Sequence, residues 1–71
     1  MNDMETKKEL TKRQLEVMNL VKHGYANKQI SRELGISIWT VKRHLHDIIR
    51  RTRANDRAHA VYICLKRGII D

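Results

Sequence analysis

The segment GISIWTVKRHLHDIIRRT, residues 35–52, distributes its apolar and polar side chains with a helical period and decides the fold. At about 100° per residue, its apolar members share one face: Ile38, Val41, Leu45, Ile48 and Ile49. The opposite face carries Trp39, Arg43, His46 and Arg50, with Lys42 and Arg53 beside them. With Ser37 as its N-cap, the pattern predicts a two-faced helix over about residues 38–51. A tryptophan on its polar face calls for an explanation.

A shorter helix is expected just before this one, from about Asn27 to Leu34. Gly35 ends it, and only two residues separate that glycine from the next helix. Two helices joined by so short a turn form a helix-turn-helix, so the two segments are expected to act as one unit.

A first helix is predicted by the segment Thr11-Lys12-Arg13-Gln14, which has the pattern of a capping box. Thr11 is the expected N-cap, and the helix runs to about Lys22 before Gly24 stops it. Apolar residues cover more than half of its circumference, which is typical of a central helix that is contacted from several sides.

A last helix is expected at about residues 57–67, with Asp56 as its cap. Residues 60–65 are all apolar or aromatic and surround the helix, although so small a domain can cover only one side. A second copy of the chain would cover the other side. The alternative is that the N-terminal tail or the pair Ile69-Ile70 folds back over it.

Length and composition predict one small all-α domain, because the 71 residues are 41% apolar and include three glycines and no proline. We expect residues 1–9 to be a flexible tail and residues 10–71 to be the domain. The N-terminus is polar, and no apolar run approaches the roughly 20 residues of a membrane-spanning helix. Cys64, the single cysteine, is expected to be a buried filler in a reducing compartment. These features predict a cytoplasmic protein with no membrane partner.

The charge is strongly basic, with 15 Lys and Arg against eight Asp and Glu and a net charge of +7. Residues 42–57 contain six of the bases and only two of the acids. Such a concentration suits a polyanion, through phosphate contacts and the release of counterions. A solvated charged face that binds nothing is the alternative.

No arrangement of residues points to catalysis or to a metal site. His44 and His46 lie about 200° apart on a helix and cannot share a metal ion. His23 and His59 have no second set of ligands nearby in the sequence. Candidate nucleophiles and bases would be scattered over exposed faces without a pocket. We therefore expect no enzyme, no cofactor, no metal and no small-molecule ligand.

Several short motifs occur in order and at near-constant spacing from residue 10 onward. They are Leu10-Thr11-x-Arg13, Gly24-x-x-Asn27-Lys28-x-Ile30, Leu34-x-Ile36-Ser37, Thr40-Val41-Lys42-x-His44 and Asp56-Arg57-x-x-Ala60-Val61. In these motifs the chain resembles the LuxR/FixJ/GerE-type DNA-binding domain of bacterial regulators, in the form of a stand-alone GerE-like small protein. The resemblance implies a four-helix domain that dimerises through its last helix and binds two-fold-related promoter half-sites.

The resemblance also implies roles for individual residues. Base contacts in the major groove are expected from Lys42, Arg43 and His46. The resemblance places contacts to the phosphate backbone at Asn27, Lys28, Thr40 and Arg57, and Ser37, Trp39 and Arg50 are expected to contact the backbone as well. The expected dimer interface consists of Ala58, Tyr62, Leu65 and Ile69. These residue types suit the tasks, because Lys and Arg donate to guanine and smaller polar groups fix the register on phosphates.

The chain departs from the family pattern at several positions. Gln14 stands where glutamate is usual, and Ala26 where serine is frequent, so Asn27 is the expected cap of the shorter helix. Thr52 and Ala54 replace two apolar anchors, which is expected to loosen the junction before the last helix or to shift its packing.

Trp39 stands where a polar residue is more usual, and three roles are open for it. The first role is sideways packing near Gln29 or Tyr25. The second is contact with a DNA sugar or phosphate, and the third is contact with another protein such as RNA polymerase.

The resulting hypothesis is a bacterial transcriptional regulator that binds promoter DNA as a homodimer and whose activity is set by its concentration or by another protein. The alternative is a protein-binding helix-turn-helix module that antagonises a longer family member by pairing with it through the last helix. A third reading, an excised domain of a larger regulator, is disfavoured by the starting methionine and the native-looking tail.

Overall fold

The structure, a computed structural model, describes residues 9–71, and within this range the chain forms four α-helices and no strand. They are α2 (Lys12–Lys22), α3 (Asn27–Leu34), α4 (Ile38–Thr52) and α5 (Arg57–Lys66). The expected all-α, four-helix fold is confirmed, and each helix begins and ends within one residue of its expected place. Residues 1–8 of the expected tail lie outside the described residues.

Side-chain caps fix the starts of α2 and α5 where the sequence placed them. At α2, Thr11 Oγ1 accepts from the Gln14 backbone N–H at 3.1 Å, and Gln14 Oε1 accepts from the Thr11 N–H at 2.9 Å. At α5, Asp56 Oδ1 accepts from the His59 N–H at 2.8 Å. Each bond satisfies a donor that the first turn of a helix leaves unpaired, so these boundaries are encoded locally.

The start of α3 differs from the expectation. Ala26, and not Asn27, is the N-cap, and it has no side-chain oxygen to offer. The Ala26 backbone N–H donates instead to Gln29 Oε1 at 2.8 Å, which supplies half of a capping box. The Asn27 side chain is thereby left available for a partner elsewhere.

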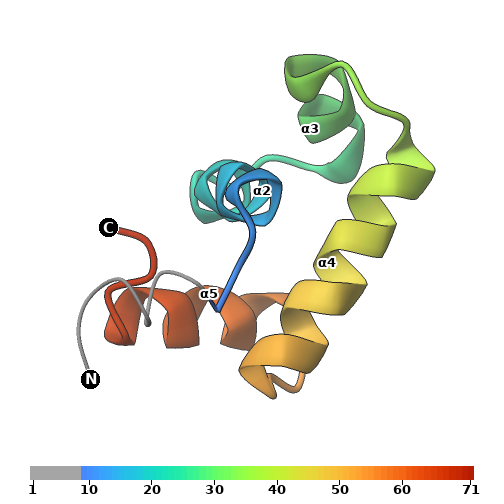
Figure 1. The fold of residues 1–71 in the computed structure, drawn as a ribbon. Helices are drawn as coiled ribbons and strands as arrows, with labels where there is room; N and C mark the ends of the chain where they lie inside the picture. The colour runs from blue at the N-terminus through green and yellow to red at the C-terminus, as the bar shows by residue number, and fades with distance from the viewer. Residues whose placement is uncertain (1–8) are drawn as a thin grey trace.

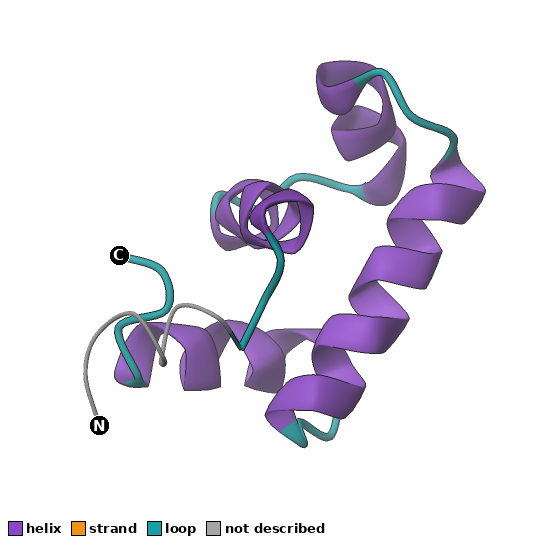
Figure 2. Cartoon of the chain, viewed as in Figure 1, coloured by secondary structure: helices purple, strands orange, loops and turns teal. Residues whose placement is uncertain are grey.

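The helices surround one core, with α2 and α4 each in contact with all the others. Figure 1 shows α2 end-on in the centre, α4 rising beside it, and α3 and α5 near opposite ends of α4; Figure 2 shows the short loops between them. Met18 of α2 lies at the centre, among buried residues from every helix. They include Val17, Ile30, Val41, Ile48, Ala60 and Cys64. The expected central position of the first helix and the burial of Cys64 are both confirmed.

The C-terminal segment folds back onto the core. The backbone N–H groups of Ile69 and Ile70 both donate to the Cys64 carbonyl oxygen, at 2.9 and 3.2 Å. Lys22 Nζ donates to the backbone oxygen of Asp71, which ties the segment to α2. Ile69, placed by the sequence on the dimer surface, is only 6% exposed. Its assignment there is corrected: the helix ends at Lys66, and the chain turns inward before Ile69.

The junction between α4 and α5 accommodates the residues that depart from the family pattern. Thr52 is 1% exposed, and its hydroxyl donates to the Ile48 carbonyl oxygen at 2.8 Å. The threonine therefore fills a core position without leaving a buried donor unpaired. Arg53 follows as the C-cap of α4 with φ of 59°, a left-handed conformation that side chains rarely adopt.

Candidate nucleic-acid interface

The recognition helix of the helix-turn-helix, α4, begins after Ser37, whose hydroxyl caps it. Ser37 Oγ accepts from the Thr40 backbone N–H at 3.0 Å, and the two side-chain hydroxyls lie 2.8 Å apart. Both residues were expected to hold phosphates, and both stand at the helix N-terminus. Backbone N–H groups and the positive end of the helix dipole favour anions at such a place.

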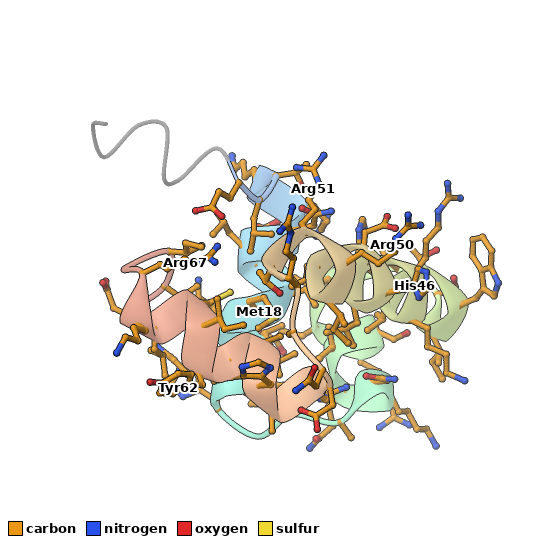
Figure 3. The ribbon with its side chains drawn as sticks, turned by 90° about the horizontal axis from the view of Figure 1, so that it is seen from below. Met18, His46, Arg50, Arg51, Tyr62 and Arg67 are labelled. Carbon is orange, nitrogen blue, oxygen red and sulfur yellow. The ribbon has the colours of Figure 1, made fainter. Side chains whose placement is uncertain are left out.

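The outer face of α4 brings together the basic residues that the sequence placed there. Lys42, Arg43, His46 and Arg50 are all exposed. On the opposite side Val41, Leu45 and Ile48 are buried. Figure 3 shows His46 and Arg50 projecting from the outer side of this helix. The expected two-faced helix is confirmed except at Ile38, the first residue of the helix, which is 40% exposed.

Trp39 is the most exposed large apolar residue on this face, with 66% of its surface open to solvent. This exposure argues against sideways packing on Gln29 or Tyr25. The Cζ atom of Arg43 lies 5.6 Å from the centroid of the indole ring, within the range of a cation–π contact. The tryptophan thus touches one of the expected base-reading residues and leaves most of its ring free.

Asn27 and Arg57, both expected at phosphates, lie against each other. Arg57 Nη1 donates to Asn27 Oδ1 at 2.5 Å, and Nη2 donates to the Tyr25 carbonyl oxygen at 2.6 Å. These two bonds join the start of α5 to the start of α3, between which no backbone contacts occur. Sequence reasoning missed this brace, since residues 30 apart in the chain carry no local signal of pairing.

A polar hollow of about 480 Å³ lies beside α4, lined by Gln14, Asp47, Arg50 and Arg51. Arg51 was not among the expected site residues, although it is exposed and adjoins Arg50 in the sequence. Its Nη1 donates to the Glu9 backbone oxygen at 2.9 Å. Figure 3 shows Arg50 and Arg51 on the same side of the molecule, so the basic surface continues into the last turn of α4. Lys28, on α3, is exposed as well.

A second exposed surface lies on α5. Ala58, Tyr62 and Leu65 recur at helical spacing along one face, and Tyr62 and Leu65 are 56% and 43% exposed. The Tyr62 ring is flanked by the His59 ring, 6.4 Å between centroids, and by Lys66 Nζ at 5.9 Å. Figure 3 shows Tyr62 on the side of α5 away from Met18. The apolar residues of this helix therefore divide into a buried face and an open one.

Two kinds of feature are missing from residues 9–71. No helix there is long and apolar enough to cross a membrane. Nor does this range hold a cluster of three or more His, Cys, Asp or Glu side chains with the spacing of a metal site.

Residues 8–64 match the family described as bacterial regulatory proteins, luxR family. The uncharacterised transcriptional regulatory protein YxjL of Bacillus subtilis is 40% identical over 60 residues, covering 84% of this chain and 28% of that protein. The transcriptional regulatory protein DegU of Brevibacillus brevis is 42% identical over 83% of this chain and 25% of that protein. LiaR of B. subtilis is 37% identical over 62 residues, which cover 87% of this chain and 29% of that protein. The chain thus spans less than a third of the length of these relatives.

Proposed function

The chain belongs to the luxR family of bacterial regulatory proteins, whose helix-turn-helix domain binds DNA, and from this premise we propose that it recognises two-fold-related promoter half-sites as a homodimer. The observation that carries the proposal is the two-sided character of α4. One side holds the helix in the core, and the other presents an exposed row of basic residues with no acidic partner within 4 Å among the described residues.

In the proposed complex α4 enters the major groove, and Lys42, Arg43 and His46 face the base edges. Lys and Arg donate to guanine O6 and N7, and one good contact of this kind is worth about 1–3 kcal/mol of discrimination against the wrong base. The helix α4, Ile38–Thr52, can take this role because the major groove is wide enough to admit one α-helix.

Phosphate contacts would flank the helix and fix its register. Lys28, Ser37, Thr40 and Arg50 are the residues best placed for them, because their side chains lie at the exposed N-terminus or along the open side of the helix-turn-helix. Asn27 and Arg57 are proposed to act mainly through their mutual bond, which holds α3 against α5.

The homodimer would form through Ala58, Tyr62 and Leu65 on α5. A two-fold interface pairs one patch with itself, and an apolar stripe at helical spacing meets that requirement. The stripe also suits the alternative partner, a longer family member that this chain would antagonise. RNA polymerase remains a proposed partner for surfaces that the DNA leaves free.

A selection of bound fragments from a random pool of DNA duplexes tests the proposal. Inverted half-sites about one helical turn apart are the expected product for a two-fold dimer. Titration of a selected duplex at two salt concentrations should then give an affinity that falls steeply with salt, since each neutralised phosphate contributes about −0.9 to the slope.

Matched variants locate the contacts. Lys42→Ala should weaken binding and relax the preference at one base pair, whereas Lys28→Ala should weaken binding to all duplexes equally. An unenriched pool would contradict the proposal. Association with a longer regulator, combined with no DNA binding by this chain, would favour the antagonist.

A further inference from the structure

Trp39 and Arg43 are in contact on the exposed side of α4, and their spacing explains why. Residues four apart on a helix lie one above the other, and a long side chain leans toward the helix N-terminus. Arg43 therefore leans over the turn that carries Trp39, which brings its Cζ to 5.6 Å from the ring centroid. The geometry is built into the helix and requires no other element.

Arg43 has a second potential partner at the same spacing and does not use it. Asp47 lies four residues further along α4, yet the ion pairs among residues 9–71 involve only Arg13 with Glu16 and Arg67 with Glu9. Within that range the Arg43 guanidinium also donates no hydrogen bond. A cation–π contact engages the charge without consuming an N–H group, so the donors of the guanidinium stay available.

The indole itself is held on one side only. With 66% of its surface exposed, Trp39 contributes little to the core, so packing does not account for a tryptophan here. A free arginine side chain loses considerable rotamer freedom when it binds, and an aromatic platform that restricts it beforehand reduces that loss.

We propose that Trp39 is a positioning residue for DNA reading: it holds the Arg43 guanidinium in the direction in which the guanidinium meets a guanine edge in the major groove. The inference rests on the proposed function and adds to it a specificity element of two residues. Arg43 donates to the base, and Trp39 determines how well it does so.

Mobility-shift titrations can test the inference with a duplex that the wild-type chain selects from a random pool and with the single-base-pair variants of that duplex. Arg43→Ala should abolish the preference at one base pair. Trp39→Ala should weaken the preference at that same base pair by about fivefold and leave the other positions unchanged. Trp39→Phe should retain most of the preference because it keeps an aromatic face, whereas Trp39→Leu should behave like Trp39→Ala.

A double-mutant cycle separates positioning from direct contact. In the Arg43→Ala background, Trp39→Ala should change the affinity by less than about twofold, because the side chain that it positions is gone. Lys42→Ala is the matched control, since Lys42 is an adjacent exposed base that makes no cation–π contact within residues 9–71. The effects of Trp39→Ala and Lys42→Ala should multiply. Circular dichroism verifies that each variant is folded.

The outcomes distinguish the two proposals. If the wild-type chain enriches no sequence, that result contradicts both the proposed function and this inference. A wild-type chain that enriches a sequence, together with a Trp39→Ala loss that is spread evenly over all duplexes or that persists in full without Arg43, overturns this inference alone. In that case the tryptophan contacts DNA independently.

Discussion

The guanidinium of Arg57 bonds to the side chain of Asn27 across 30 residues of sequence, at 2.5 Å, and to the backbone oxygen of Tyr25 at 2.6 Å. It is half-buried at the point where α5 starts, beside the loop that leads into α3. The bond connects the helix proposed to dimerise with the helix that precedes the DNA-facing turn. The relative orientation of the two proposed binding surfaces thus depends in part on one arginine.

Replacing Arg57 with alanine should lower the free energy of unfolding by about 1–3 kcal/mol, since it leaves a carbonyl and an amide oxygen without their charged donor. Arg57→Lys should recover only part of the loss, because an ammonium group lacks the two-pronged geometry. Urea denaturation measures both effects. Arg50→Ala is the control: an exposed arginine should change stability by less than about 0.5 kcal/mol. In DNA titrations Arg50→Ala should reduce the salt slope, whereas an equal reduction by Arg57→Ala would contradict the bracing role.

Arg53→Gly should stabilise the domain by about 0.5–1 kcal/mol. Arg53 holds φ of 59°, which costs a residue with a Cβ atom about 1–2 kcal/mol, and glycine's greater freedom in the unfolded chain offsets part of the gain. Arg53→Val should be clearly destabilising, since a β-branched residue tolerates this conformation poorly. In thermal unfolding the melting temperature should be highest for Arg53→Gly, intermediate for the wild type and lowest for Arg53→Val. Any other order would contradict the claim that Arg53 is strained.

Tyr62→Asp and Leu65→Asp should weaken the proposed dimer without unfolding the protomer. Both side chains are about half exposed on α5, so an added charge is tolerated in the monomer but is costly when two copies bury it together. Sedimentation equilibrium measures the association, and Asn19→Asp on the exposed side of α2 serves as the control. Unchanged association in both α5 variants would place the dimer contact elsewhere.

The thiol of Cys64 should make stability fall at alkaline pH. Burial raises its pKa, the charge of Glu9 raises it further, and Arg67 partly opposes the shift. A raised pKa in the folded state means that the neutral thiol stabilises the fold at pH values below the unfolded pKa, about 8.5. This contribution is lost as the pH rises through the folded pKa. Cys64→Ala should flatten the alkaline decline of the unfolding free energy. An equal decline in both proteins would assign it to other groups.

The fold followed from the sequence because its signals are local. Thr11, Ser37 and Asp56 each cap a helix through an atom only three residues from the backbone group that it satisfies, so a short window contains the whole interaction. The apolar period of α4 likewise identified its buried side. One local signal was misread: Gln29 closes the start of α3 where Asn27 was expected to do so.

The site was less predictable, because its details depend on where the chain goes next. Extending the period of the last helix places Ile69 in register with Tyr62 and Leu65, yet the helix stops first and the segment turns into the core. Asn27 and Arg57 looked like two independent phosphate contacts until the fold brought them together. The contact of Trp39 with Arg43 follows from helical spacing, but the 66% exposure of Trp39 is visible only in the folded chain.

Trp39 is the only tryptophan in the chain, and it stands on the face that would meet DNA. Its emission is therefore an intrinsic optical reporter of that face, without any attached dye. Because the indole is already largely in water in the native state, unfolding should change its spectrum little, whereas contact with a ligand should quench or shift it. The chain thus carries a fluorescent probe whose emission should respond to ligand binding at this face and change little on unfolding.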